Sequence, residues 1–187
     1  MSLPTGNDGT PATRRLFLAL NPDDVERRQL RDAVREHLPP GRARWVALEN
    51  LHMTLIFFGS VTAAVQACIE QAVAAVDAPG FALTLERFGY WPRSHMLWAM
   101  PSELPAALLQ LVDSLQSALF EQCGIKPDER SFTAHVTLGR KVNRAPRASR
   151  FTPVTWTVMR ITLMESASTP DGVRYIERAA WPLRAPQ

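Results

Sequence analysis

The chain contains one short pattern twice, His-x-Thr-Leu, at residues 52–55 and 135–138. Only four histidines occur in the chain, so two of them in the same pattern are hard to attribute to chance. Each motif lies in a β-prone run. Because side chains alternate across a strand, each histidine shares a face with the threonine two residues later. Each motif therefore presents an imidazole and a hydroxyl side by side, with apolar residues on the opposite face.

Two imidazoles and two hydroxyls in one pocket have the chemistry needed to open a cyclic phosphodiester. A neutral imidazole takes a proton from water, and a charged imidazole gives a proton to the departing sugar oxygen. The ordinary imidazole pKa of about 6.5 lets both forms coexist near neutral pH, and a well-placed acid or base contributes about 10²–10⁴-fold in rate. The hydroxyls of Thr54 and Thr137 can donate to the non-bridging oxygens and hold the phosphorus in line.

The remaining histidines and the cysteines fit no catalytic or metal-binding pattern. His37 ends a predicted helix, where it meets the helix dipole, and His95 opens a predicted strand. We interpret both as structural. The motif histidines have no carboxylate or thiol at ligand spacing, so no metal is expected. The two cysteines, Cys68 and Cys123, form neither a Cys-x-x-Cys pair nor a zinc pattern, which favours a reducing cytoplasm.

The whole chain has the size and composition of one domain. It has 187 residues, 46% hydrophobic and 21% charged, and a net charge of +3 carried mostly by arginine. Arginine suits phosphate recognition, so this charge permits an RNA partner without requiring one. Residues 1–13 are polar, and no apolar run reaches membrane-spanning length. The sequence predicts a disordered segment over 1–13, a single domain over 14–187, and a soluble cytoplasmic protein.

The hydrophobic pattern predicts a mixed order of strands and helices. Strands are expected at 14–20, 51–58, 81–88, 95–100, 134–140, 154–165 and 173–180, and helices at 22–38, at 62–76 and from 105 to about 124. Strands and helices do not alternate strictly enough for a parallel doubly wound sheet. An α+β fold with antiparallel sheets is predicted, with 141–153 as the clearest internal loop.

The sequence resembles the two-histidine (2H) phosphoesterases, and within them the bacterial and archaeal RNA 2′,3′-cyclic phosphodiesterases, historically called 2′-5′ RNA ligases. The similar blocks are residues 15–20, 44–59, 132–140 and a closing hairpin that ends at 181–183, so the resemblance covers about 14–184. It implies a bilobed α+β fold. Two pseudo-twofold-related antiparallel sheets would line a central cleft, with helices packed outside and neither a metal nor a nucleotide cofactor.

The resemblance also implies an activity and roles for five residues. The reaction would hydrolyse an RNA-terminal 2′,3′-cyclic phosphate to a 2′-phosphate, and 2′-5′ RNA ligation would be its reverse. His135 would be the base that activates water and His52 the acid that protonates the 3′-oxygen. Thr54, Thr137 and Arg140 would bind the phosphate. The expected partner is RNA with a cyclic end or a cyclic nucleotide, bound by a monomer with no membrane and no obligatory protein partner.

Some alternatives stay open at the level of sequence. Strict alternation sends Arg140 to the face opposite His135, so it reaches the pocket only if the strand ends or bulges near Gly139; otherwise it is a surface arginine. In a regular strand, Ile56 and Phe58 share the face of the first motif histidine, where Phe58 would either stack a nucleobase or join the core. Two other functions fit the motifs: a cyclic phosphodiesterase for a small nucleotide, and a non-catalytic module that binds RNA ends.

Overall fold

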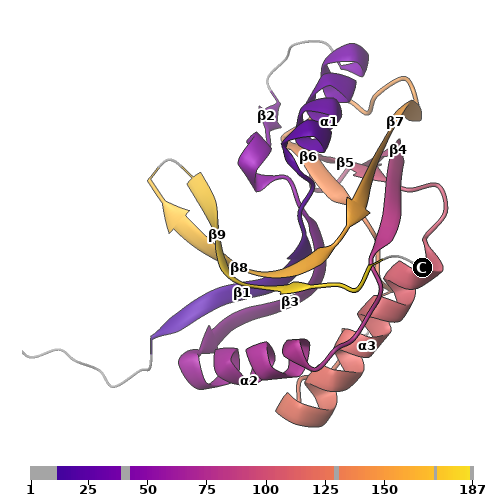
Figure 1. Cartoon of the computed structure of the whole chain (residues 1–187). Coiled ribbons are helices and arrows are strands. Elements are labelled where there is room, and N and C mark those ends of the chain that lie inside the picture. Colours follow the sequence, from indigo (N-terminus) through magenta and orange to yellow (C-terminus); the bar gives the residue numbers. More distant parts are fainter. Residues whose placement is uncertain (1–11, 39–42, 129–130, 171, 186–187) are drawn as a thin grey trace, which may run out of the picture.

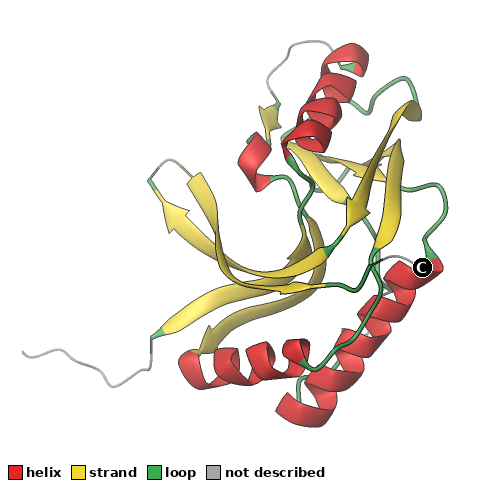
Figure 2. Cartoon of the chain, in the orientation of Figure 1, coloured by secondary structure: helices red, strands yellow, loops and turns green. Residues whose placement is uncertain are grey.

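In the computed structural model, which describes residues 12–38, 43–128, 131–170 and 172–185, one mostly antiparallel sheet is flanked by helices (Figures 1 and 2). The elements are β1 (Thr13–Leu20), α1 (Asp24–His37), β2 (Arg44–Trp45), the 3₁₀ turn η1 (Leu48–Asn50), β3 (Met53–Thr62), α2 (Ala63–Ala74), β4 (Phe81–Trp91), β5 (Met96–Met100), α3 (Ala106–Cys123), β6 (Val136–Arg140), β7 (Arg150–Val158), β8 (Arg160–Thr169) and β9 (Gly172–Pro182). The predicted α+β class is confirmed.

The sheet consists of two halves that meet at one residue pair. Its strand order is β7-β4-β5-β6-β3-β1-β8-β9, and β3 pairs with β6 only through Met53 and Val136. A strand–helix–strand unit occurs in each half of the chain, as β1-α1-β3 and as β5-α3-β6, and its two strands are antiparallel neighbours. This repeat corresponds to the two pseudo-twofold-related sheets that the resemblance implies, and it brings the two His-x-Thr-Leu motifs to the junction.

The helices cover different halves of the sheet. Helix α1 packs against β6 and β7, whereas α2 and α3 pack against each other and against β3 (Figure 1). The buried stripe of α3 consists of Leu108, Leu111, Val112, Leu115 and Leu119. Each such side chain contributes about 1.5–3 kcal/mol of burial energy. Leu104, which helical spacing also places on this stripe, precedes the helix and is 40% exposed.

The predicted strand 154–165 is wrong, because the chain forms two strands there. β7 pairs with β4, and β8 pairs with β1, so the backbone crosses from one half of the sheet to the other at Met159. The predicted loop 141–153 also ends early, since β7 begins at Arg150. Pro153 is tolerated within β7 because that strand lies at the edge of the sheet.

A disulfide joins α2 to α3. Cys68 and Cys123 are bonded, with 5.9 Å between their Cα atoms. Disulfides persist mainly in oxidising compartments, so this pair removes the support that cysteine usage gave to a reducing cytoplasm. In the described part of the chain, no helix is long and apolar enough to cross a membrane. Most of the predicted disordered segment 1–13 lies outside the described residues, and Thr13 begins β1.

Candidate active site

The two motifs meet where the halves of the sheet join. His52 and His135 lie immediately before β3 and β6, which run antiparallel and pair through one residue of each. The register of this pair places His52 beside Thr137 and Thr54 beside His135. All four side chains are half-buried. The structure therefore brings together the four residues that the sequence singled out.

Both imidazoles are oriented by the backbone in the same way. His52 Nδ1 lies 2.7 Å from the carbonyl oxygen of Asn50, and His135 Nδ1 lies 2.7 Å from that of Thr133. A carbonyl oxygen only accepts hydrogen bonds, so each Nδ1 carries a hydrogen and donates it. In each ring Nε2 is therefore the nitrogen that gains or loses a proton during acid–base chemistry.

Aromatic rings line both histidines. His52 contacts Phe17 and Tyr175, with ring centroids at 4.9 and 4.7 Å. His135 contacts Trp91 and Trp98, at 5.0 and 5.7 Å. Sequence analysis assigned none of these rings to the site. Phe17 and Tyr175 occur in blocks that carry the family resemblance, whereas Trp91 and Trp98 follow no motif.

This surrounding disfavours positive charge on both rings. Burial lowers the pKa of His52, and the hydrogen bond to Asn50 opposes that effect only in part. A positive charge on His135, when it is protonated, and the charges of Arg140 and Arg27 lower the pKa of His52 further. Burial also lowers the pKa of His135, again opposed by its backbone hydrogen bond. Both imidazoles are therefore neutral at pH 7 in the ligand-free protein.

A bulge in β6 turns Arg140 toward the site. Successive residues of β5 pair with Gly139 and with Thr137, so Leu138 is an extra residue in β6. Beyond a bulge the alternation of faces is reversed, and Arg140 returns to the face of Thr137. Its charge acts on His52. The bulge near Gly139 that sequence analysis required of this arginine is present.

Bulges in β3 overturn the predicted faces of Ile56 and Phe58. The pairing with β1 skips Leu55 and again Phe58, so each bulge reverses the alternation. Ile56 and Phe58 pack against the main core, and the core alternative for Phe58 is confirmed. Phe57 instead pairs with Phe17, on the side of the first motif histidine, and is 52% exposed.

A cavity of about 580 Å³ opens beside the second motif histidine. Thr54 and His135 form one wall, and Gln116, Lys126 and Phe132, from the end of α3 and the segment after it, form another. Cavities of 300–1,000 Å³ are typical of small-ligand sites. Among the described residues there is no group of three or more His, Cys, Asp or Glu side chains that could hold a metal ion.

A sequence model of the 2′-5′ RNA ligase superfamily matches residues 21–170. The chain belongs to this superfamily. An RNA 2′,3′-cyclic phosphodiesterase of Escherichia coli strain K12 is 32% identical over 174 residues, which cover 91% of this chain and 97% of the relative. One of Archaeoglobus fulgidus is 28% identical over 171 residues, covering 86% and 96%. The crystal structure of E. coli LigT complexed with 3′-AMP matches with a TM-score of 0.83 and 31% identity, covering 92% of this chain and 99% of that one.

Proposed function

We propose that the protein hydrolyses the 2′,3′-cyclic phosphate at an RNA end to a 2′-phosphate, by metal-independent acid–base catalysis. The observation that carries the proposal is the junction of the two motifs. Each motif supplies an imidazole fixed through Nδ1, with Nε2 available for proton transfer, and a threonine hydroxyl beside the other imidazole. The relatives' activity as RNA 2′,3′-cyclic phosphodiesterases supports the same reaction.

In the proposed reaction, His135 Nε2 removes a proton from water as its oxygen attacks phosphorus. The bond from phosphorus to the 3′-oxygen breaks, and His52 Nε2 protonates that oxygen. The product carries a 2′-phosphate. Overall, His52 has lost one proton and His135 has gained one, and proton exchange with solvent restores the starting state. Thr54 and Thr137 donate hydrogen bonds to the non-bridging oxygens, and Arg140 supplies a charge-assisted donor.

To act as the acid, His52 must be protonated, but its surroundings disfavour the protonated form. Burial lowers the pKa of His52 most, and the cationic Arg140 and Arg27 lower it further. A phosphodiester anion placed between these groups has the opposite effect, since a nearby negative charge favours the imidazolium. We infer that substrate binding itself charges His52, so that the acid is created only in the complex.

The direct test is hydrolysis of adenosine 2′,3′-cyclic phosphate in excess chelator. His52→Ala and His135→Ala should each lower kcat by about 10²–10⁴-fold. His37→Ala is the matched control, because His37 ends α1 and bonds its own helix at Ala33. Wild-type turnover by either motif variant would show that this histidine is structural. Activity that chelation abolishes and a divalent ion restores would overturn the metal-free mechanism.

The division of roles needs a substrate whose leaving group requires no acid. On bis(4-nitrophenyl) phosphate, His52→Ala should lose much less rate than on the cyclic nucleotide, because 4-nitrophenolate departs unprotonated. His135→Ala should lose rate equally on both substrates. The reverse pattern would exchange the two roles.

A small cyclic nucleotide is the second candidate substrate, because the cavity beside His135 is no larger than a nucleotide site requires. Steep loss of affinity with salt for a cyclic-ended oligonucleotide, and little loss for a mononucleotide, would favour RNA. Binding of RNA ends without turnover would leave only a binding module.

We also propose a monomer, since one chain supplies both motifs. We also propose a cytoplasmic location. The Cys68–Cys123 disulfide argues against it, because disulfides persist mainly in oxidising compartments.

A further inference from the structure

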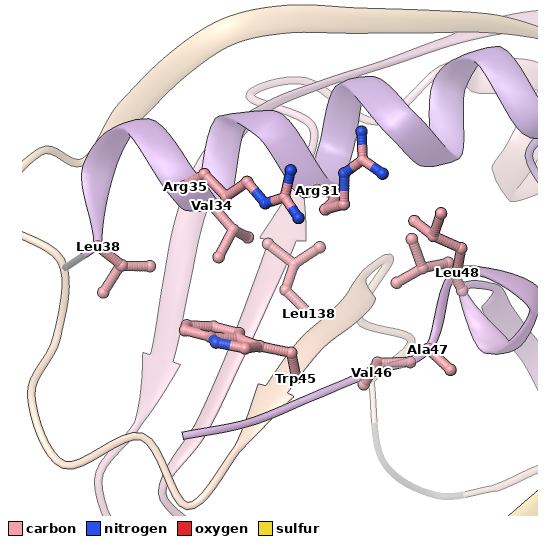
Figure 3. Close-up of a pocket in the computed structure, with 10 residues that line it drawn as sticks. Arg31, Val34, Arg35, Leu38, Trp45, Val46, Ala47, Leu48 and Leu138 are labelled. Atoms are coloured by element: carbon pink, nitrogen blue, oxygen red, sulfur yellow. The ribbon is translucent and has the colours of Figure 1, made fainter. Parts of the chain in front are cut away.

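A second cavity, also of about 580 Å³, lies behind the catalytic junction, between α1 and the segment 45–51 (Figure 3). Leu51 and Leu138 form part of its wall. These residues are the chain neighbours of His52 and Thr137, but they belong to the main core on the opposite face of the sheet. The cavity therefore contacts the chain neighbours of His52 and Thr137, on the opposite face of the sheet.

This cavity is the counterpart, in the internal repeat, of the one beside His135. The cavity beside His135 is lined by α3, by the segment after it and by β3 with Leu55. The second cavity is lined by α1, by the segment after it and by β6 with Leu138. The two leucines hold the same position in the two motifs. The fold thus builds two similar hollows and equips only one of them with a motif histidine and threonine.

The lining of the second cavity combines an indole, aliphatic side chains and two guanidinium groups. Trp45 is 37% exposed, and part of its ring lies over Gly139, where an added Cβ would be 2.8 Å from the ring. Arg31 and Arg35 project from α1 on the other side (Figure 3). Both contact the single carboxylate of Asp32, at 2.9 and 3.8 Å, which leaves a net positive charge at the mouth.

A cationic path connects this cavity with the catalytic face. Arg44 is the cross-strand partner of Arg140, and such partners share a face of the sheet. Two like charges in this position repel each other, and a phosphate between them would remove the repulsion. Trp45 follows Arg44 and points to the other face, toward the cavity. Among the described strands β2 pairs only with β6.

We propose that the second cavity is a subsite for a nucleobase of the RNA upstream of its cyclic end. The base stacks on Trp45, Arg31 and Arg35 bind the adjacent backbone, and the chain reaches the site over Arg44 and round β2. Proteins hold single-stranded bases by stacking on aromatic rings and guanidinium planes in this way. The inference rests on the proposed function, and it commits the site to an oligonucleotide rather than a mononucleotide.

The test compares two substrates, adenosine 2′,3′-cyclic phosphate and an adenosine tetranucleotide that ends in a 2′,3′-cyclic phosphate. The quantity measured is the ratio of kcat/KM for the tetranucleotide to that for the mononucleotide. Trp45→Leu should lower this ratio by about 5- to 150-fold, the loss typical of one stacked base. The double variant Arg31→Gln, Arg35→Gln should also lower it. Arg28→Gln is the control, because Arg28 is exposed on α1 and does not line the cavity.

The outcomes separate the subsite from the proposed function. Since Trp45 packs on Gly139, its replacement can disturb β6, and the arginine double variant provides the arm that leaves this packing intact. Unchanged ratios in both variants would overturn the subsite and leave the hydrolase standing. An equal fall of the kcat/KM ratio in Arg28→Gln would show that diffuse charge attraction is responsible, and it would also overturn the subsite. A wild-type dimer that Trp45→Leu dissociates would overturn the subsite too, because Trp45 would then belong to a protein interface. Failure of the wild type on both substrates would instead refute the proposed function.

Discussion

Breaking the Cys68–Cys123 disulfide should lower the free energy of unfolding by about 4 kcal/mol. The bond closes a loop of 55 residues, and the chain-entropy relation for a loop of that length gives about 4 kcal/mol at 25 °C. For a protein of this size the loss corresponds to a fall in Tm of about 8–16 °C. Neither residue of the junction pair, Met53 and Val136, lies within the loop, so the catalytic strands keep their pairing when the bond is opened.

Urea unfolding followed by circular dichroism, with and without reductant, measures this effect. The double variant Cys68→Ser, Cys123→Ser should unfold at the lower midpoint of the reduced wild type and should not respond to reductant. Its kcat on a cyclic mononucleotide at 25 °C should match that of the wild type. Equal midpoints for the double variant and the oxidised wild type would refute the loop-closure reasoning. Two titratable thiols in the native, unreduced protein would refute the bond itself.

Four further outcomes follow from the site. The lowered pKa values of His52 and His135 should place the maximum of a bell-shaped kcat/KM profile below pH 6.5, and a maximum above pH 7.5 would contradict them. Because both pKa values are lower in the folded protein than in the unfolded chain, the unfolded chain takes up protons at a higher pH. The free energy of unfolding should therefore fall as the pH drops below 6.5 and be level above it, as measured in denaturant titrations. Gly139→Ala puts a Cβ 2.8 Å from the ring of Trp45 and should cost about 1–3 kcal/mol in urea unfolding. Thr137→Val removes one donor to an anionic phosphate and should lower kcat/KM on a cyclic nucleotide by about 10- to 100-fold.

Local patterns predicted the parts of the fold that local chemistry determines. The leucine spacing of α3 appears in the structure as its buried stripe, and the left-handed Gly124 ends that helix with a φ of 64°. Twin motifs on two strands were enough to predict that His52 and His135 lie on one face of a sheet. Each of these inferences depends on residues close together in sequence.

Bulges could not be predicted in the same way, because they are decided by the partner strand. A strand with one extra residue has the same composition as a regular one, yet every side chain beyond the bulge changes face. The consequence differed between strands. The bulge at Leu138 brings Arg140 to the site, and the bulges in β3 turn Ile56 and Phe58 toward the core. The rings of Tyr175 and Trp91 were missed for a related reason, since their contacts with the histidines join distant parts of the chain.

An internal repeat provides two equivalent imidazoles, but hydrolysis needs two different ones. The repeat gives both histidines the same hydrogen bond from Nδ1 to a backbone carbonyl two residues earlier, so the motif cannot assign their roles. The difference comes from the surroundings. Burial is the largest influence on both pKa values, but His52 also faces the charges of Arg140 and Arg27, which do not act on His135. These cations add to the effect of burial, which lowers the pKa of His52 most in the free protein, and they also attract the phosphate anion that lets His52 become the acid. The asymmetry of the reaction therefore depends on residues outside the motifs, and exchanging the histidines' neighbours, rather than the histidines, is the change expected to exchange their roles.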